Sequence, residues 1–176
     1  MRLSDVGELG LLRELESQRL ITGTEHDAAL LADGFVVTQD ALVEGVHFRL
    51  DWLTWRELGF RAAAVNISDL AASAARPEAL LVTLAAPPRV RVEDVVELYK
   101  GLAAAGVPVR GGDTTSADQI LVGVTAVGRS DRVPGRTGAR PGDRIVVSGP
   151  LGGASAAFRR GAYLRPPIRV EEGLRL

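Results

Sequence analysis

The sequence predicts an α+β domain built on one mixed β-sheet that is covered by helices. Helical and extended patterns follow one another in the order αβαβαβββα, and β-branched segments are separated by Gly and Pro turns. The apolar run at 62–72 is typical of a buried helix. With 176 residues, 46% of them apolar, the chain is long enough to bury a core of its own.

The start of the buried helix is the most strongly marked point in the chain. Thr54 is a good N-cap, and Glu57 follows three residues later, which is the pattern of a capping box. Leu53 and Leu58 occupy the two positions of a hydrophobic staple, which sets the angle at which the chain enters the helix. We expect the helix to run from here toward Pro77.

One face of this helix is polar. Asn66, Asp69 and Ser73 are spaced i, i+3 and i+7, so that they lie on the same side. Burial of the Asp69 carboxylate is unfavourable unless hydrogen-bond donors, a cation or a metal accompany it. The alternative is that Asp69 lies on a solvated rim or caps a second helix after a break.

The other elements follow from hydrophobic period and turn residues. A helix is expected at 4–19, with Val6, Leu9, Leu12 and Leu15 on its inner face, and another over 92–103 that ends near Gly106. Strands are expected at 35–38, 80–85, 107–110, 119–128 and 144–148, and a short helix after Ser148. Asp33-Gly34 is a turn signal that makes a hairpin before the first strand plausible.

Composition excludes several classes of protein. The chain has 21 basic and 22 acidic residues, a balance that argues against an obligatory nucleic-acid partner. It has no cysteine, which excludes disulfides, thiol catalysis and cysteine-based metal sites, and which fits a cytoplasmic protein. No apolar run reaches membrane-spanning length, and the N-terminus does not resemble a signal peptide, so no membrane association is expected.

Four aspartates stand in the kind of context that builds a site for a hard cation. Asp27 lies in a polar loop, Asp40 at the end of a strand, Asp69 on the helix face and Asp113 beside two glycines. Magnesium prefers oxygen ligands and is often held by a few carboxylates together with substrate phosphates. Glycine next to Asp113 would let a phosphate approach the backbone. The alternative is that Asp and Gly simply belong to turns.

Other chemistries have less support. The chain has no G-x-x-x-x-G-K-[ST] phosphate-binding loop. The glycine-rich segment 149–153 follows an expected strand and precedes a helix, so its amides could hold a phosphate, although such segments are often only turns. His26 and His47 are too few for a zinc site without cysteine, and His47 is equally compatible with a packed or surface position.

Together these residues resemble the thiamine-monophosphate kinases, whose superfamily includes aminoimidazole ribonucleotide synthetase, selenophosphate synthetase and a hydrogenase maturation factor. The resemblance runs from about Glu8 to the C-terminus. It rests on the strings Asp27-Ala28-Ala29-Leu30, Asp40-Ala41-Leu42-Val43-Glu44-Gly45-Val46-His47-Phe48, Val65-Asn66-Ile67-Ser68-Asp69-Leu70-Ala71-Ala72 and Gly111-Gly112-Asp113-Thr114-Thr115, and on the turn at 136–143.

The resemblance implies transfer of the γ-phosphate of ATP to thiamine monophosphate, with Mg²⁺ bound to the nucleotide. It also implies the fold of the N-terminal domain of aminoimidazole ribonucleotide synthetase, with helices on one side of the sheet and a homodimer whose two sheets form a barrel. By motif position, Asp27, Asp40, Asp69 and Asp113 would hold metal, while Thr38, Gly112, Asp113, Thr114 and Arg136 would contact the nucleotide. His47 would lie near the substrate, and no residue is assigned a catalytic role.

Some features depart from the family pattern. His26 replaces a usual aspartate, and Gln39 stands where a small hydroxyl residue is common. The chain stops where the family enters its second domain, so we expect an N-terminal half that is weakly active or inactive alone. Residues 1–150 would be the ATP- and magnesium-binding and dimerisation domain, and 151–176 a short helix and linker. The alternatives are a non-catalytic nucleotide-binding or dimerisation module, or another ATP-dependent enzyme of the superfamily.

Overall fold

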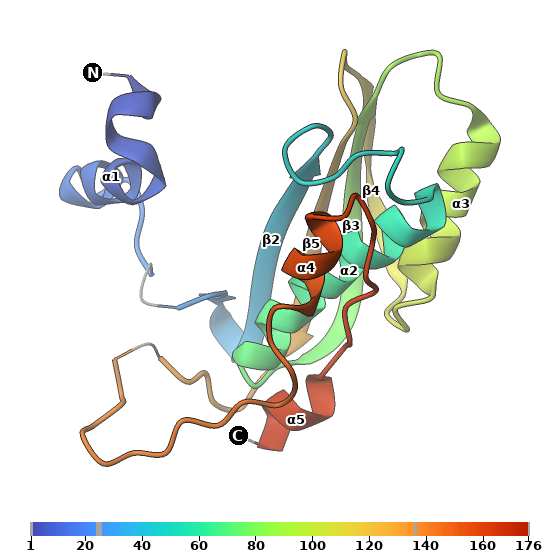
Figure 1. Ribbon diagram of the computed structural model, residues 1–176. Coiled ribbons are helices and arrows are strands. Elements are labelled where there is room, and N and C mark those ends of the chain that lie inside the picture. Colours follow the sequence, from blue (N-terminus) through green and yellow to red (C-terminus); the bar gives the residue numbers. More distant parts are fainter. Residues whose placement is uncertain (1, 24–25, 136, 176) are drawn as a thin grey trace.

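The structure is a computed structural model that describes residues 2–23, 26–135 and 137–175. Its elements are arranged around one sheet, with the N-terminal helix set apart from it (Figure 1). In chain order they are α1 (Leu3–Ser17), β1 (Ala29–Leu30), the 3₁₀ turn η1 (Ala32–Gly34), β2 (Phe35–Val43), α2 (Trp55–Ala72), β3 (Arg76–Ala86), α3 (Val92–Ala103), β4 (Val109–Ser116), β5 (Leu121–Arg129), α4 (Gly153–Phe158) and α5 (Val170–Arg175).

The sheet has five strands in the order β1-β2-β5-β3-β4. The β3/β4 pair is parallel and the β1/β2, β2/β5 and β3/β5 pairs are antiparallel, so the sheet is mixed, as predicted. Helices α2 and α3 lie on the same face of it, and α4 lies over α2 (Figure 1). A parallel pair needs a crossover connection, and α3 supplies it between β3 and β4.

The core lies between the sheet and α2. Alternate residues of β3 and β5 point into it, which is the two-residue period of a strand with one covered face. The inward set is Leu80, Val82, Leu84, Val122, Val124 and Ala126, all of them at most 2% exposed. On the other face of β3, Leu81 remains 43% exposed. The sheet therefore has one covered and one uncovered face.

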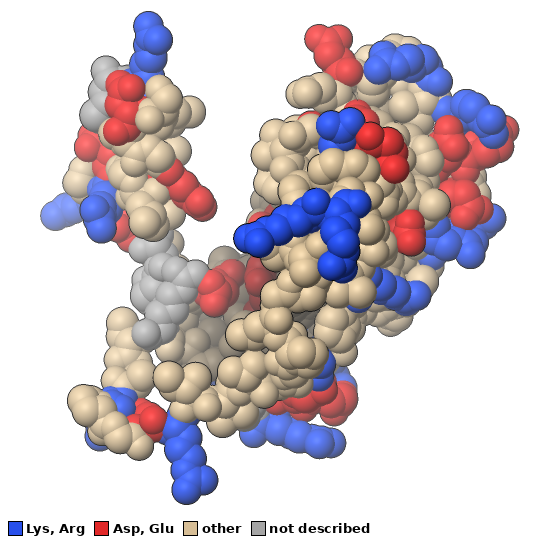
Figure 2. Space-filling view, in the orientation of Figure 1, with Lys and Arg blue, Asp and Glu red and all other residues tan. Residues whose placement is uncertain are grey.

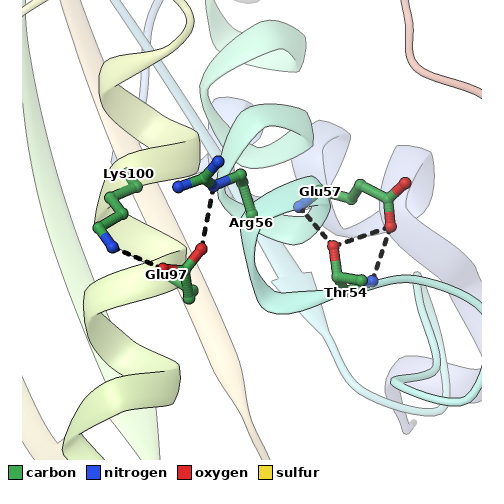
Figure 3. A network of polar contacts seen from close by, with 5 residues as sticks. All are labelled: Thr54, Arg56, Glu57, Glu97 and Lys100. Atoms are coloured by element: carbon green, nitrogen blue, oxygen red, sulfur yellow. Dashed lines mark hydrogen bonds and ion pairs between the residues drawn. The ribbon is translucent and has the colours of Figure 1, made fainter.

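The start of α2 confirms the predicted capping box (Figure 3). The Glu57 N–H donates to Thr54 Oγ1 at 3.2 Å, and the Thr54 N–H donates to Glu57 Oε2 at 2.8 Å. Near the start of α2, Glu97 of α3 forms ion pairs with Lys100 at 2.7 Å and with Arg56 at 3.0 Å. The hydrogen bond from Lys100 and the positive charge of Arg56 lower the pKa of the Glu97 carboxyl. The ion pair between Arg56 and Glu97 joins the first turn of α2 to α3.

Two glycines allow α2 and α3 to pack closely. A Cβ on Gly59 would lie 1.9 Å from the carbonyl oxygen of Leu98, and one on Gly101 would lie 2.0 Å from that of Arg56. Such separations are impossible for real side chains, so each helix has a glycine where the backbone of the other crosses it. The position of α3 over the sheet depends on this crossing.

Several strand predictions are wrong in extent. Expected at 35–38, β2 continues to Val43 because it pairs with β5 along its whole length. The strand expected at 107–110 begins at Val109 and continues through the glycine-rich stretch 111–115 to Ser116, because this stretch pairs with β3. The expected strand at 144–148 is absent from the described structure: this segment has no regular structure, and Ile145 is 95% exposed. A β-branched run forms a strand only where another strand pairs with it.

The N-terminal helix also differs from its prediction. A residue with non-helical dihedral angles, Gly7, interrupts α1, and none of the helix residues is buried. Leu9, expected on an inner face, is 70% exposed, so that expectation is wrong for the single chain. The described helices include none that is long and apolar enough to cross a membrane.

Candidate functional site

A cavity of about 580 Å³ lies where the loop before β1 meets the first half of β2. Two of the predicted site residues, Asp27 and Thr38, line it. The other lining residues are Thr22, Gly23, His26, Ala28, Ala29, Leu30, Leu31, Val37 and Gln39. The cavity forms because β1 pairs with β2 through Ala29 and Val37, which brings the preceding loop alongside Thr38 and Gln39.

Asn66 connects this part of β2 to α2. It is fully buried, and its Nδ2 donates to the Ala62 carbonyl oxygen at 3.0 Å, which orients the amide. Its Oδ1 accepts from the Asp40 N–H at 2.9 Å, and its carbonyl oxygen accepts from Thr38 Oγ1 at 3.2 Å. Asp40 therefore extends from a backbone that a buried amide holds in place.

The polar face of α2 lies partly in the interior. Asn66 is 0% and Ser73 2% exposed, whereas Asp69 between them is partly buried. The helix is continuous from Trp55 to Ala72, so Asp69 does not cap a second helix after a break. Sequence analysis placed the three residues on one face but gave Asn66 no role, because its partners on β2 are 26 and 28 residues away.

The predicted position of Asp40 at a strand end is wrong. It lies inside β2, opposite Val124 of β5. The β-branched run stops at Thr38, which is why the sequence indicated an end there, but pairing with β5 carries the strand on to Val43. Asp40 is exposed although it shares a row of the sheet with the buried Val124 and Val82.

Asp113 lies apart from the other three aspartates. Strands β5 and β3 separate its strand, β4, from β2, a distance of about 14 Å at normal strand spacing. Asp113 pairs with Thr83 of β3, which is exposed on the uncovered face of the sheet. Asp40 is instead aligned across the strands with Val124 and Val82, which are buried on the covered face. One chain therefore does not bring Asp40 and Asp113 to the same metal ion.

The neighbours of Asp113 have a structural role in β4. Gly112 has φ 154°, and a Cβ there would lie 1.8 Å from the Val82 carbonyl oxygen, so glycine is required for β4 to pair with β3. Thr114, on the same strand as Gly112, pairs with Leu84 of β3. Both were predicted to contact the nucleotide, and in the single chain they lie beside Asp113, away from the cavity.

His47 lies in the turn that follows β2 and is exposed. Its Nδ1 accepts a hydrogen bond from the Val43 N–H at 3.0 Å. Since Nδ1 is an acceptor here, a neutral ring carries its proton on Nε2, which leaves a donor for a ligand. His26 lines the cavity, and its buried Nδ1 has no hydrogen-bond partner among the described residues.

The donor chemistry of the site suits magnesium better than zinc. Within residues 2–23, 26–135 and 137–175, no three His, Asp or Glu side chains are grouped to hold a metal ion by themselves. Magnesium on a nucleotide does not need such a cage, because one or two carboxylates and the phosphates complete its coordination. Asp27 and Asp40, both exposed near or along the cavity, fit that requirement. Arg136, a predicted nucleotide contact, lies outside the described residues, as do Thr24 and Glu25.

Comparison with known proteins identifies the family. Residues 25–130 match the family "AIR synthase related protein, N-terminal domain". A thiamine-monophosphate kinase of Corynebacterium glutamicum is 35% identical over 185 aligned residues, covering 98% of this chain and 56% of the relative. A thiamine-monophosphate kinase of Rhodopirellula baltica is 38% identical over 146 residues, covering 80% of this chain and 45% of the relative.

A solved structure agrees over nearly the whole chain. The structure described as AaThiL complexed with AMPPCP and TMP superposes with a TM-score of 0.91 at 30% identity, covering 98% of this chain and 63% of that one. The chain spans about half the length of the curated relatives it matches. With its mixed five-stranded sheet, its matching motifs and these relatives, the chain belongs to the AIR synthase related family, of which it carries the N-terminal domain, and it is homologous to thiamine-monophosphate kinases.

Proposed function

We propose that this chain is the magnesium- and nucleotide-binding N-terminal half of an enzyme that phosphorylates thiamine monophosphate with ATP. The observation that carries the proposal is the TM-score of 0.91 with AaThiL, a protein solved with AMPPCP and TMP. The curated relatives named as thiamine-monophosphate kinases support the same activity. Residues 1–150 would bind nucleotide and form the dimer, and 151–176 would lead toward a second domain.

In this proposal the cavity beside β2 receives the phosphates of ATP. Asp27, Asp40 and Asp69 would hold magnesium, which neutralises phosphate charge as the γ-phosphoryl group is transferred. Thr38, whose hydroxyl is already directed by Asn66, would sit under the phosphates. Phosphoryl transfer depends on positioning and charge neutralisation more than on covalent chemistry, so a rigid backbone at Asp40 is a useful property.

The remaining predicted residues would contact either the acceptor substrate or the nucleotide of a second subunit. His47 would bind the acceptor through its Nε2–H, since its Nδ1 is already bonded within the chain. Asp113, Gly112, Thr114 and Arg136 would contact the nucleotide, with Asp113 contributed across a homodimer interface. The uncovered face of the sheet, where Leu81 is 43% exposed, is the surface that a second copy would cover.

Calorimetric titration of the chain with AMPPCP, with and without magnesium, tests the proposal. Saturable binding that requires magnesium supports a nucleotide site within these residues. The absence of binding in both conditions would remove this chain as a nucleotide-binding half. Nucleotide binding without phosphorylation of thiamine monophosphate, even when a complete relative's second domain is supplied, would favour a non-catalytic module instead.

A further inference from the structure

The cavity beside β2 combines an imidazole with side chains that carry oxygen atoms. His26 lines it, and so do Asp27, Thr22, Thr38 and Gln39. In the space-filling view, acidic side chains border the hollow between the segment after α1 and the body of the sheet (Figure 2). A cation that enters this cavity therefore meets a ring nitrogen as well as oxygen atoms.

The imidazole of His26 is incompletely bonded in the cavity wall. Its Nδ1 is buried, and the parts of the chain that the structure describes offer this nitrogen no hydrogen-bond partner. A buried polar atom without a partner is unfavourable, and a bound ion or water is a common explanation for one in a native structure. The Nδ1 atom is therefore available to a ligand of the cavity.

Two neighbouring segments restrict the position of this ring. Just after His26, Ala28 is buried and Ala29 pairs with β2, so the end of the loop is anchored to the sheet. From another part of the chain, the backbone of Gly135 passes close to the ring, and a Cβ there would lie 3.4 Å from His26 Cε1. Val133, packed against the core, anchors that second segment. A ring held in this way loses little freedom when it binds a ligand.

The kinds of donor present distinguish between divalent cations. Magnesium prefers ligands that are all oxygen, whereas imidazole binds first-row transition ions better. Manganese combines the two properties, because it shares the octahedral oxygen chemistry of magnesium and also accepts an imidazole nitrogen. A cavity that offers one imidazole beside a carboxylate and hydroxyls thus suits manganese better than magnesium.

We propose that His26 coordinates the metal of the nucleotide site through Nδ1, and that this site takes Mn²⁺ in preference to Mg²⁺. Asp27 would supply a carboxylate oxygen, and the nucleotide phosphates would supply further ligands. Coordination through Nδ1 places the ring proton on Nε2. The inference rests on the proposed nucleotide site, to which it adds the identity of the metal and a ligand residue.

Calorimetric titration of the whole chain with AMPPCP, once in Mn²⁺ and once in Mg²⁺, measures the preference. We expect the parent to bind the Mn²⁺ complex at least about tenfold more tightly than the Mg²⁺ complex. His26→Asp exchanges the nitrogen for an oxygen ligand and should reduce this ratio to about threefold or less. A parent without a preference for Mn²⁺, or a ratio unchanged in His26→Asp, would overturn the proposal.

Pulsed electron paramagnetic resonance of the bound Mn²⁺ identifies the ligand atom. A coordinated imidazole nitrogen modulates the spin echo of the ion, whereas carboxylate and phosphate oxygens do not. We expect this nitrogen coupling in the parent and in His47→Ala, which removes the only other histidine. It should be absent from His26→Ala and from His26→Asp. A parent without the coupling, or a His26→Ala variant that retains it, would overturn the assignment.

These measurements separate the failure of this inference from that of the proposed function. Equal binding of AMPPCP in the two metals, without nitrogen coupling, would keep the nucleotide site and remove His26 as a ligand. Weaker binding by His26→Ala when the parent lacks the coupling would place His26 on a phosphate oxygen and overturn the metal assignment. No binding of AMPPCP in either metal would remove the nucleotide site itself. Unchanged far-ultraviolet circular dichroism of each variant would show that the fold is intact.

Discussion

Asn66 accepts a hydrogen bond of 2.9 Å from the main-chain N–H of Asp40, so a buried amide on α2 sets the position of a carboxylate on β2. The amide is itself held by the Ala62 carbonyl oxygen at 3.0 Å. Because both ends of this contact lie in regular elements, Asp40 occupies a defined place beside the cavity. A carboxylate positioned in this way loses little freedom when a cation binds.

Replacement of Asn66 by Ala should destabilise the fold. It removes the partner of the Asp40 N–H and leaves a buried cavity in its place, with an expected loss of about 1–3 kcal/mol in the free energy of unfolding. Urea denaturation measures this change in the free energy of unfolding. Ser68→Ala, at an exposed position on the same helix, is the control, with an expected change within about 0.5 kcal/mol. An Asn66→Ala variant with the same free energy of unfolding as the parent would mean that the contact does not hold β2 against α2.

Asp40→Asn and Asp69→Asn should each weaken binding of AMPPCP in the presence of magnesium. Loss of a carboxylate ligand lowers the affinity by about tenfold or more. Both variants should keep the far-ultraviolet circular dichroism of the parent. Asp118→Asn, at an exposed aspartate outside the cavity, provides the control. Parental affinity in both site variants would remove these carboxylates from the metal site.

Leu81→Asp should abolish a homodimer without unfolding the chain. Leu81 is 43% exposed in the middle of the uncovered sheet face, where a carboxylate is tolerated in water but not in an apolar interface. Sedimentation velocity would show a dimer for the parent and a monomer for the variant. Val92→Asp changes another exposed apolar residue, 75% exposed on α3, and should leave the dimer intact. A parent chain that stays monomeric at high concentration would exclude the homodimer.

Mixing of two inactive variants tests whether Asp113 acts across that dimer. Asp40 and Asp113 lie on β2 and β4, with two strands between them. If a partner's Asp113 completes the site, one of the two sites in an Asp40→Asn/Asp113→Asn heterodimer is intact. Calorimetry of the mixture should then show a fraction of high-affinity nucleotide sites that neither variant has alone. Absence of such sites, with heterodimers demonstrated, would place Asp113 outside the site.

Tyr163 should make the fold sensitive to alkaline pH. Its pKa is raised, first by burial and then by Glu57, to about 12, so folding favours the protonated hydroxyl. This contribution to stability is complete below the unfolded-state pKa of about 10 and is lost as the pH rises through about 12. Tyrosinate absorbance should show one late titration, absent in Tyr163→Phe and retained in Tyr99→Phe. Two normal titrations in the parent would contradict the burial of the hydroxyl.

The sequence by itself predicted the elements that local interactions determine. Helix α2 begins where Thr54 and Glu57 form a capping box, and α3 occupies 92–103 as its hydrophobic period predicts. The sequence also singled out the four aspartates that are proposed as metal ligands, because a carboxylate in an apolar or glycine-rich context is visible without a structure. Signals of this kind lie within a few residues of one another, so no knowledge of distant contacts is needed.

Only the tertiary structure decided how far the strands run and which residues meet. Residues 111–115 form part of β4 because β3 offers hydrogen bonds to them, whereas 144–148 remain without regular structure. Asn66 reaches β2, and Asp113 is separated from Asp40, through strand pairing between residues far apart in the chain. Backbone hydrogen bonds in a sheet are satisfied by other segments, so strand ends and the composition of a site depend on partners that local sequence does not name.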